Sequence, residues 1–325
     1  MNFSIIYGMD YLSFTVTEND SGRRLDKIAR RLVPELPLSA IYKHIRKGFI
    51  KLNGCHTKAE IIVKNGDVVQ VAAFLEEDLK KNKSHKERKK VEKTLCRLDD
   101  VFKNRFIRII NKPYNIPVHS GGQGETSLND IVYNEYIQEY GENSISFVPG
   151  PLHRLDKKTT GLVSFSQNLA AARWFSKALH NHCIQKTYIA ILQGKLESPT
   201  EWDEPIAKKH AHTSVLPVDC GNYNGTAITI AKVQITTGRT HQIRIHCSSH
   251  GFPLLGDTTY GGAKTNEPQD FFLHAMRMGF PSGNPLDLPN SIFAPLPSNF
   301  TNMLEKCLSN FSPNSYNING YEDIF

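Results

Sequence analysis

The stretch GPLHRLDKKTTGLVSF, residues 150–165, places a short polar loop directly before an apolar run. Leu162 to Phe165 has the pattern of a buried strand, and Gly161 before it permits a tight turn. Asp156 lies in the loop, after a His-Arg pair. Taken alone, an Asp between Leu and Lys is most often a solvated surface carboxylate. A loop held by a rigid strand is, however, where folds present reactive groups, so Asp156 is a candidate catalytic residue.

Further strand and helix patterns surround this stretch. Apolar runs predict strands at residues 106–110, 187–192 and 227–235. An apolar stripe after Asn168 predicts a helix whose core-facing positions are Leu169, Ala172, Phe175 and Leu179. Strands outnumber helices and do not alternate regularly with them. This pattern favours an α+β fold with a mixed, mainly antiparallel central sheet flanked by helices and loops.

The N-terminal part shows a second, smaller pattern. Apolar residues at helical spacing predict a helix from Leu25 to Leu32, for which Ser21 is an available N-cap. A second helix is predicted from Ser39 to Lys47, ending at Gly48. Two helices in this short span indicate a small accessory domain.

Two strand-like runs, residues 49–52 and 67–71, complete this pattern, and Asn53-Gly54 after the first is a strong turn signal. We therefore predict three regions in the chain. They are a small α+β domain at residues 12–75, a basic linker at 76–98 and a large domain at 99–325.

The charge distribution favours a polyanionic partner. The 325 residues include 39 Lys and Arg against 32 Asp and Glu, a net charge of +7. Eight basic and two acidic residues lie between Lys80 and Lys93. The small domain contributes six candidates for contact with nucleic acid, each of which is on its own more often a solvated surface charge. These candidates are Arg23, Lys27, Arg30, Lys43, Arg46 and Lys51.

Several classes of protein are not supported by the sequence. No stretch approaches the roughly 18 apolar residues of a membrane span, and the N-terminus lacks a basic leader. The six cysteines, at positions 55, 96, 183, 220, 247 and 307, form no CxxC pair. His241 and His246 do not have the i,i+4 spacing of helical metal ligands, and Gly121-Gly122-Gln123-Gly124 is not a phosphate-binding loop. We expect a cytoplasmic monomer without metal or cofactor.

Two further segments have unusual polar residues. TTGRTHQIRIH, residues 236–246, can be interpreted simply as the start of a basic helix that packs on the sheet. KTYIAILQG, residues 186–194, reads as a buried strand that Tyr188 opens, and such a tyrosine is usually a core residue. Neither segment assigns a function by itself.

Together and in this order, the three segments resemble the RluA-type pseudouridine synthases of ribosomal and transfer RNA. That family carries His-Arg-Leu-Asp-x-x-Thr-Ser-Gly, a Lys-x-Tyr strand and Gly-Arg-Thr-His-Gln-Ile-Arg-x-His. The matching positions here are 153–161, 186–188 and 238–246. The resemblance covers roughly residues 105–305, and residues 22–71 are similar to the small RNA-binding domain named after ribosomal protein S4. Thr160 stands where the family usually has Ser.

The resemblance implies a pseudouridine synthase fold and an isomerase. Such an enzyme cleaves the bond from ribose C1′ to uracil N1, turns the base and joins C1′ to C5. Hydrolytic glycosidases use two carboxylates, whereas a reaction that consumes no water can use one. By resemblance, Asp156 is that group, Arg244 pairs with it, and Tyr188 stacks on the uracil. Whether Asp156 attacks C1′, attacks the base or removes the 2′ proton stays open.

The resemblance also implies the substrate. Arg154, His153 and Arg239 are expected to bind an RNA from which the uridine is flipped out of its stack. Large-subunit (23S) ribosomal RNA is favoured as this substrate. Two alternatives stay open: a synthase acting on transfer RNA, and a non-catalytic RNA-binding or ribosome-assembly protein. The short stretch after Pro205-Ile206 is rich in His (His210 and His212), and its role is open.

Overall fold

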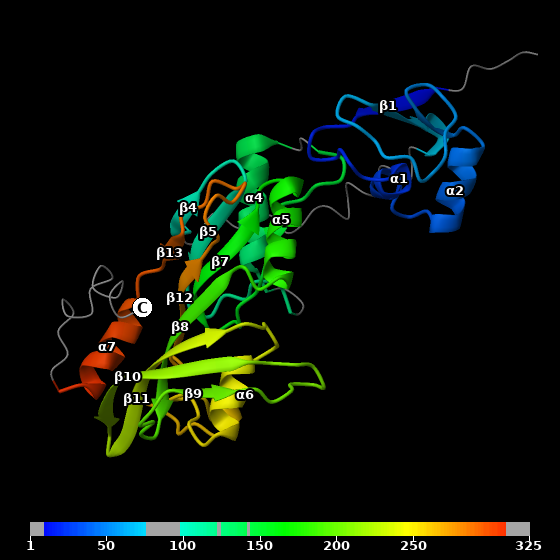
Figure 1. Cartoon of the computed structure of the whole chain (residues 1–325). Helices are drawn as coiled ribbons and strands as arrows, with labels where there is room; N and C mark the ends of the chain where they lie inside the picture. The colour runs from blue at the N-terminus through cyan, green and yellow to red at the C-terminus, as the bar shows by residue number, and fades with distance from the viewer. Residues whose placement is uncertain (1–9, 76–97, 122–124, 142–143, 310–325) are drawn as a thin grey trace, which may run out of the picture. The chain divides into compact units, whose positions relative to one another are not determined.

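The computed structural model describes residues 10–75, 98–121, 125–141 and 144–309, and the chain divides into two compact units (Figure 1). The N-terminal unit comprises Met1–Leu95, Asp130–Pro149 and Asn168–Ala170. The large unit comprises Cys96–Asn129, Gly150–Gln167 and Ala171–Phe325. The basic run from Lys80 to Lys93 lies outside the described residues, as do nearly all of the expected linker and the Asn- and Ser-rich end of the chain.

Within residues 10–75 the N-terminal unit contains a three-stranded antiparallel sheet and two helices. In chain order its elements are β1 (Tyr11–Thr15), α1 (Leu25–Leu32), α2 (Leu38–Arg46), β2 (Ile50–Leu52), β3 (Val68–Ala72) and the 3₁₀ turn η1 (Ala73–Leu75). The sheet order is β1-β3-β2. Both predicted helices and both predicted strands are present within one residue of their expected ends. The strand β1 was not predicted, because its side chains are half-buried or exposed and show no clear apolar alternation.

The predicted N-cap of the first helix is wrong. The N-cap position is Arg24, with no side-chain cap, and the N–H of Ser21 instead donates to the carbonyl oxygen of Thr17. The first N–H groups of the helix find other partners. Those of Leu25 and Asp26 donate to carbonyls in the segment 59–61, so the helix start needs no capping side chain.

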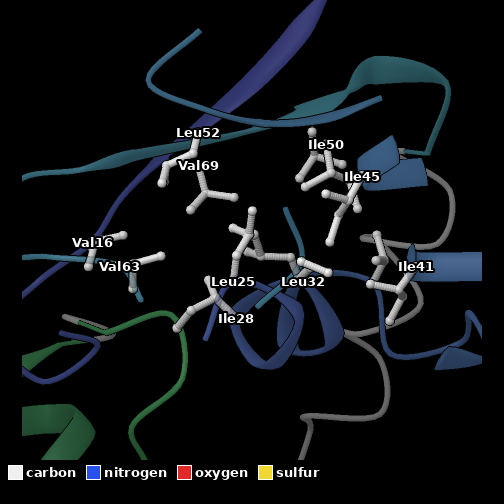
Figure 2. Close-up of a cluster of buried hydrophobic side chains, with 14 of the residues drawn as sticks. Val16, Leu25, Ile28, Leu32, Ile41, Ile45, Ile50, Leu52, Val63 and Val69 are labelled. Atoms are coloured by element: carbon white, nitrogen blue, oxygen red, sulfur yellow. The ribbon is translucent and has the colours of Figure 1, made fainter. Parts of the chain in front are cut away.

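One apolar core holds this unit together (Figure 2). Leu25 and Ile28 of α1 lie opposite Val69 of β3, and Ile41 and Ile45 of α2 close the same cluster. Each of these side chains is at most 1% exposed. Burial of one such aliphatic side chain contributes about 1.5–3 kcal/mol, so this cluster fixes the two helices on the sheet.

The large unit is built around one ten-stranded sheet. Its strands are β4 (Asp100–Lys103), β5 (Ile107–Lys112), β6 (Gly150–Pro151), β7 (Thr160–Ser166), β8 (Gln185–Gln193), β9 (Thr200–Trp202), β10 (Thr213–Tyr223), β11 (Thr226–Ile235), β12 (Leu273–Gly279) and β13 (Ser291–Phe293). Their order is β4-β5-β7-β12-β8-β11-β10-β9, with β6 on β7 and β13 on β12. Among the described strands only β7 and β12 pair in parallel, which confirms the predicted mixed, mainly antiparallel α+β fold.

The helices of the large unit are α5 (Leu169–His180, from Ala171 onward), α6 (Gln242–Ser249) and α7 (Ser298–Cys307), with a short 3₁₀ helix η2 (Thr258–Tyr260) (Figure 1). The helix α4 (Leu128–Tyr140) is grouped with the N-terminal unit from Asp130 onward. The buried face of α5 consists of Ala171, Phe175 and Ala178, whereas Leu169 and Ala172 are only half-buried. The buried face of α5 is therefore rotated slightly about the helix axis from the apolar face that the sequence predicted. No helix in the described part of the chain has the length and apolar character that a membrane span requires.

The loop before β7 is fixed tightly to the sheet. Gly161 has φ +107°, and a Cβ at this position would lie 2.3 Å from the carbonyl oxygen of Ala275 on β12. Only glycine permits this approach. The loop that carries Asp156 thus starts from a defined position beside the centre of the sheet.

Candidate active site

The three segments quoted above meet around one pocket of the large unit, with a volume of about 530 Å³. The loop 152–159, the start of β8 and the segment 235–244 supply most of its lining. All six candidate catalytic and substrate-binding residues lie in this lining. They are Asp156, Arg244, Tyr188, Arg154, His153 and Arg239.

Asp156 faces a cationic or polar donor at each carboxylate oxygen. Nη1 of Arg244 lies 3.8 Å from Oδ2, and Nε2 of His241 lies 3.8 Å from Oδ1. Both distances exceed that of a direct hydrogen bond, so neither donor is hydrogen-bonded to the carboxylate.

Arg244 is held from three sides. Its Nε and Nη2 donate to the two carboxylate oxygens of Asp257 at 2.6 and 2.8 Å. Its guanidinium carbon lies 4.7 Å from the ring centroid of Tyr260 and 4.5 Å from that of Phe271. The direct ion pair of Arg244 is therefore with Asp257, and the remaining Nη1 is the atom that points toward Asp156.

Tyr188 lies on β8, paired with β11 and β12, and is 6% exposed. Burial, assisted by the charge of Asp156, raises the pKa of its phenol, so the hydroxyl stays protonated. Among the described residues none forms a hydrogen bond with this hydroxyl. The ring and hydroxyl are thus free to contact a molecule in the pocket.

Sequence reasoning missed Lys112, a fully buried lysine at the end of β5. Its Nζ donates to the carbonyl oxygens of Pro113, Ile116 and Lys157 at 2.8–2.9 Å. The last of these bonds ties the lysine to the loop of Asp156. Burial lowers the pKa of Lys112 to about 7, against the opposing effect of the Asp156 charge. The available signal was a lysine at the end of an isoleucine-rich strand.

The substrate-binding candidates have different surroundings. His153 accepts a hydrogen bond from the backbone N–H of Ser164 at 3.1 Å and stacks on Phe175, and burial lowers its pKa to about 3. It is a neutral packing residue at the edge of the pocket. Arg154 is exposed and forms no ion pair with any described residue. Lys186 is a further pocket cation that sequence reasoning did not select, and burial lowers its pKa.

The His-rich stretch supports the pocket through its backbone. Nε of Arg239 donates to the carbonyl oxygen of His210, and Nε2 of Gln242 donates to that of His212, both at 2.8 Å. His246 contacts Thr213 and the Glu204 carbonyl rather than His241. No cluster of three or more potential metal ligands was found among the described residues.

The N-terminal unit carries the six RNA-binding candidates. Lys43 and Arg46 line a second cavity of about 380 Å³ together with Lys58. Lys27 and Arg30 are exposed on α1. Arg23 is half-buried, and Nζ of Lys51 lies 4.2 Å from the ring centroid of Tyr11.

Comparisons with known proteins agree with the sequence resemblance. A family model described as RNA pseudouridylate synthase matches residues 107–249. The chain is 33% identical over 264 residues to the ribosomal large subunit pseudouridine synthase D of Yersinia pestis, which covers 77% of each chain. It is 31% identical over 265 residues to the protein of that name from Escherichia coli K12, covering 77% of this chain and 76% of that one. A solved human structure, RNA pseudouridylate synthase domain containing 4, shares the fold with a TM-score of 0.52 at 20% identity, covering 64% of this chain and 92% of that one.

Proposed function

Given that the chain belongs to the RNA pseudouridylate synthase family, we propose that it isomerises specific uridines of large-subunit (23S) ribosomal RNA to pseudouridine. The names of its relatives support this choice of RNA. Asp156 is the group that acts on the flipped uridine. One observation carries this assignment: among the described residues that line the pocket, Asp156 is the only acidic one.

A single carboxylate suits this isomerisation. Hydrolysis of a glycosidic bond needs an acid for the leaving group and a base for water, hence two carboxylates. Pseudouridine formation breaks the C1′–N1 bond and makes a C1′–C5 bond, while C5 loses a proton and N1 gains one. No water enters the balance. An ionised Asp156 stabilises or traps the positive charge that develops as the first bond breaks.

The other pocket residues support this step. Arg244 orients Asp156, because its Nη1 is aimed at Oδ2 by the Asp257 pair. Tyr188 packs its ring on the uracil, and its hydroxyl, which burial keeps protonated, is available there as a hydrogen-bond donor. Arg154 contacts a phosphate or fills the space of the extracted base. Flipping the uridine costs a few kcal/mol, which RNA contacts outside the pocket compensate.

Residues 12–75 supply such remote contacts in our proposal, as an S4-like RNA-binding domain. The clustering of Lys43, Arg46 and Lys58 around one concave surface supports a phosphate contact there. We also propose that the protein acts as a monomer in the cytoplasm.

Mapping pseudouridines tests the function. Ribosomal and transfer RNA from cells with the gene, without it, and with Asp156→Asn in its place are treated with carbodiimide and read by primer extension. We expect defined pseudouridines of the large-subunit RNA to disappear in the last two strains. Asp287→Asn is the matched control, because Asp287 is exposed and Asn tolerates its φ of +53°.

The alternatives give different maps. Loss of sites in transfer RNA alone would identify a transfer-RNA synthase. If no pseudouridine disappears from either RNA, the protein is an RNA-binding protein without this activity, and the proposal is wrong.

A further inference from the structure

A rigid turn at residues 254–262 lies behind the two side chains that face Asp156. The N–H of Asp257 donates to the Leu254 carbonyl at 3.0 Å, and the N–H of Gly262 donates to the Asp257 carbonyl at 2.8 Å. The N–H of Leu255 donates to Ile191 of β8, the strand that carries Tyr188. A Cβ at Gly262 would lie 2.3 Å from the Leu254 carbonyl oxygen, so the turn closes only with glycine. The turn is therefore fixed to the sheet.

Tyr260 of this turn contacts both neighbours of Asp156. Its hydroxyl lies 2.8 Å from Nδ1 of His241. Its ring centroid lies 4.7 Å from the guanidinium carbon of Arg244, on which Phe271 also packs. A cation over an aromatic face is attracted to it, and the attraction grows when water is excluded. One side chain thus restrains the donor at each oxygen of the carboxylate.

His241 adopts an unusual backbone conformation at the start of α6. Its φ is +54°, in the left-handed region that non-glycine residues seldom occupy. Such strain persists only where the surrounding structure enforces it, and it is concentrated at functional sites. Here the conformation places Nε2 3.8 Å from Oδ1 of Asp156 while Nδ1 meets the Tyr260 hydroxyl.

Electrostatics favour one arrangement of protons in this chain of contacts. A carboxylate favours a proton on the imidazole nitrogen that faces it, so Nε2 carries the proton. In the neutral ring Nδ1 is then an acceptor, and the Tyr260 hydroxyl donates to it. The tyrosine therefore selects the tautomer that presents an N–H to Asp156.

We propose that Tyr260 is a positioning residue of the reaction: its hydroxyl holds His241 with Nε2–H toward Asp156, and its ring, with Asp257 opposite, holds Arg244. This inference rests on the proposed role of Asp156. Without the hydroxyl, His241 can exchange tautomers, and Oδ1 loses a fixed donor. The carboxylate then spends less time in its reactive orientation, so the rate at saturating RNA falls while RNA binding is unchanged.

Tyr260→Phe is the decisive variant, because it keeps the ring over Arg244 and removes only the hydroxyl. We expect the single-turnover rate at saturating RNA to fall about tenfold, with the Kd for RNA unchanged within about twofold. Tyr223→Phe is the matched control, because Tyr223 packs against the cluster around Phe272 outside the pocket. Tyr260→Leu, which also removes the ring, is expected to be slower still. A Tyr260→Phe rate within twofold of wild type overturns the proposal.

A double-mutant cycle tests whether Tyr260 acts through His241. His241→Asn cannot reach Tyr260 or Asp156 but tolerates the left-handed backbone. If the two residues act as one unit, adding Tyr260→Phe to His241→Asn causes no more than about a twofold further loss. Multiplicative losses in the double variant would show that Tyr260 acts independently, which contradicts the proposal.

Nitrogen NMR of histidine-labelled protein gives a readout that needs no turnover. The ring of His241, assigned by its loss in His241→Asn, should be the Nε2–H tautomer in the wild type and a mixture in Tyr260→Phe. Identical spectra in the two proteins would contradict the proposal. An inactive wild type with the expected tautomers would contradict the proposed function instead, so the two failures are distinguishable.

Discussion

Arg244 in the pocket and Arg46 on α2 carry the same guanidinium group in opposite surroundings. The Arg244 side chain is 8% exposed, bound by both oxygens of Asp257 and enclosed by two aromatic rings. Arg46 is exposed, beside Lys43 and Lys58 at the rim of an open cavity. The guanidinium of Arg244 is therefore held in a single position and orientation. The guanidinium of Arg46 can approach an anion from many directions.

This difference predicts two kinds of mutational effect. A buried, oriented charge is little screened by salt, and its removal leaves partners without compensation. Its loss should therefore reduce the rate of the chemical step. Exposed cations attract phosphates through a field that salt screens, so their loss should reduce affinity in small, salt-dependent steps.

Asp156→Asn should have the largest effect. The amide keeps the size of the side chain but loses the charge that must interact with the uridine, so we expect the rate to fall at least about 10³-fold. Release of tritium from RNA labelled at C5 of uridine measures it. The Kd for RNA and the melting temperature should be unchanged. Activity within tenfold of wild type would remove Asp156 from the mechanism.

Arg244→Ala should cost at least about 10²-fold in rate, because it leaves Asp257 buried without its partner and Asp156 without a facing cation. Arg244→Lys is the sharper control. A lysine keeps the charge but cannot bind Asp257 through two parallel bonds, so it should restore only part of the rate. Full activity of the lysine variant would show that charge alone matters at this position.

Lys112 should make stability depend on pH. Its pKa is lowered to about 7 in the folded chain from an ordinary value of 10.5. Between these values the unfolded chain holds one proton more, so the free energy of unfolding rises with pH from about 7 to 10.5 and is lowest below 7. Urea denaturation at pH 6, 7.5 and 9 should show this rise. In Lys112→Met the free energy of unfolding should rise less over the same pH range, because the contribution of Lys112 is absent. Equal slopes in both proteins would indicate an ordinary pKa.

Lys43→Ala should have the smallest effect. We expect the Kd for RNA to rise a few-fold and the slope of log affinity against log salt to fall by about one unit. The rate at saturating RNA should match that of wild type. Binding that is unchanged at every salt concentration would remove Lys43 from the RNA contact.

The difference between buried and exposed elements also explains which helices and strands the sequence could predict. Apolar patterns located α1, α2, β5, β7, β8 and β11. Each helix buries one face, and each of these strands is buried on both faces over much of its length. They missed β10, which has no buried residue after Val215 and whose pairing with β11 is interrupted between Pro217 and Asp219. They also missed β1, whose side chains are nowhere fully buried.

In the site, family motifs led to Asp156, Tyr188 and Arg244, which the structure brings to one pocket. They did not indicate that Arg244 pairs directly with Asp257, or that Tyr260 contacts His241. Both contacts join segments 13 to 19 residues apart through a tertiary turn. Local spacing carries no information about such contacts, because they depend on how the turn packs on β8.

The most direct test compares two full-length variants side by side: Asp156→Asn, and the charge reversal Lys43→Glu with Arg46→Glu. For each, the Kd for RNA and the single-turnover rate of pseudouridine formation at saturating RNA are measured. The account predicts that Asp156→Asn lowers only the rate, and that the charge reversal lowers only the affinity. If the charge reversal slows the saturated reaction as much as Asp156→Asn does, or if Asp156→Asn weakens binding instead of chemistry, the division between the two regions is wrong.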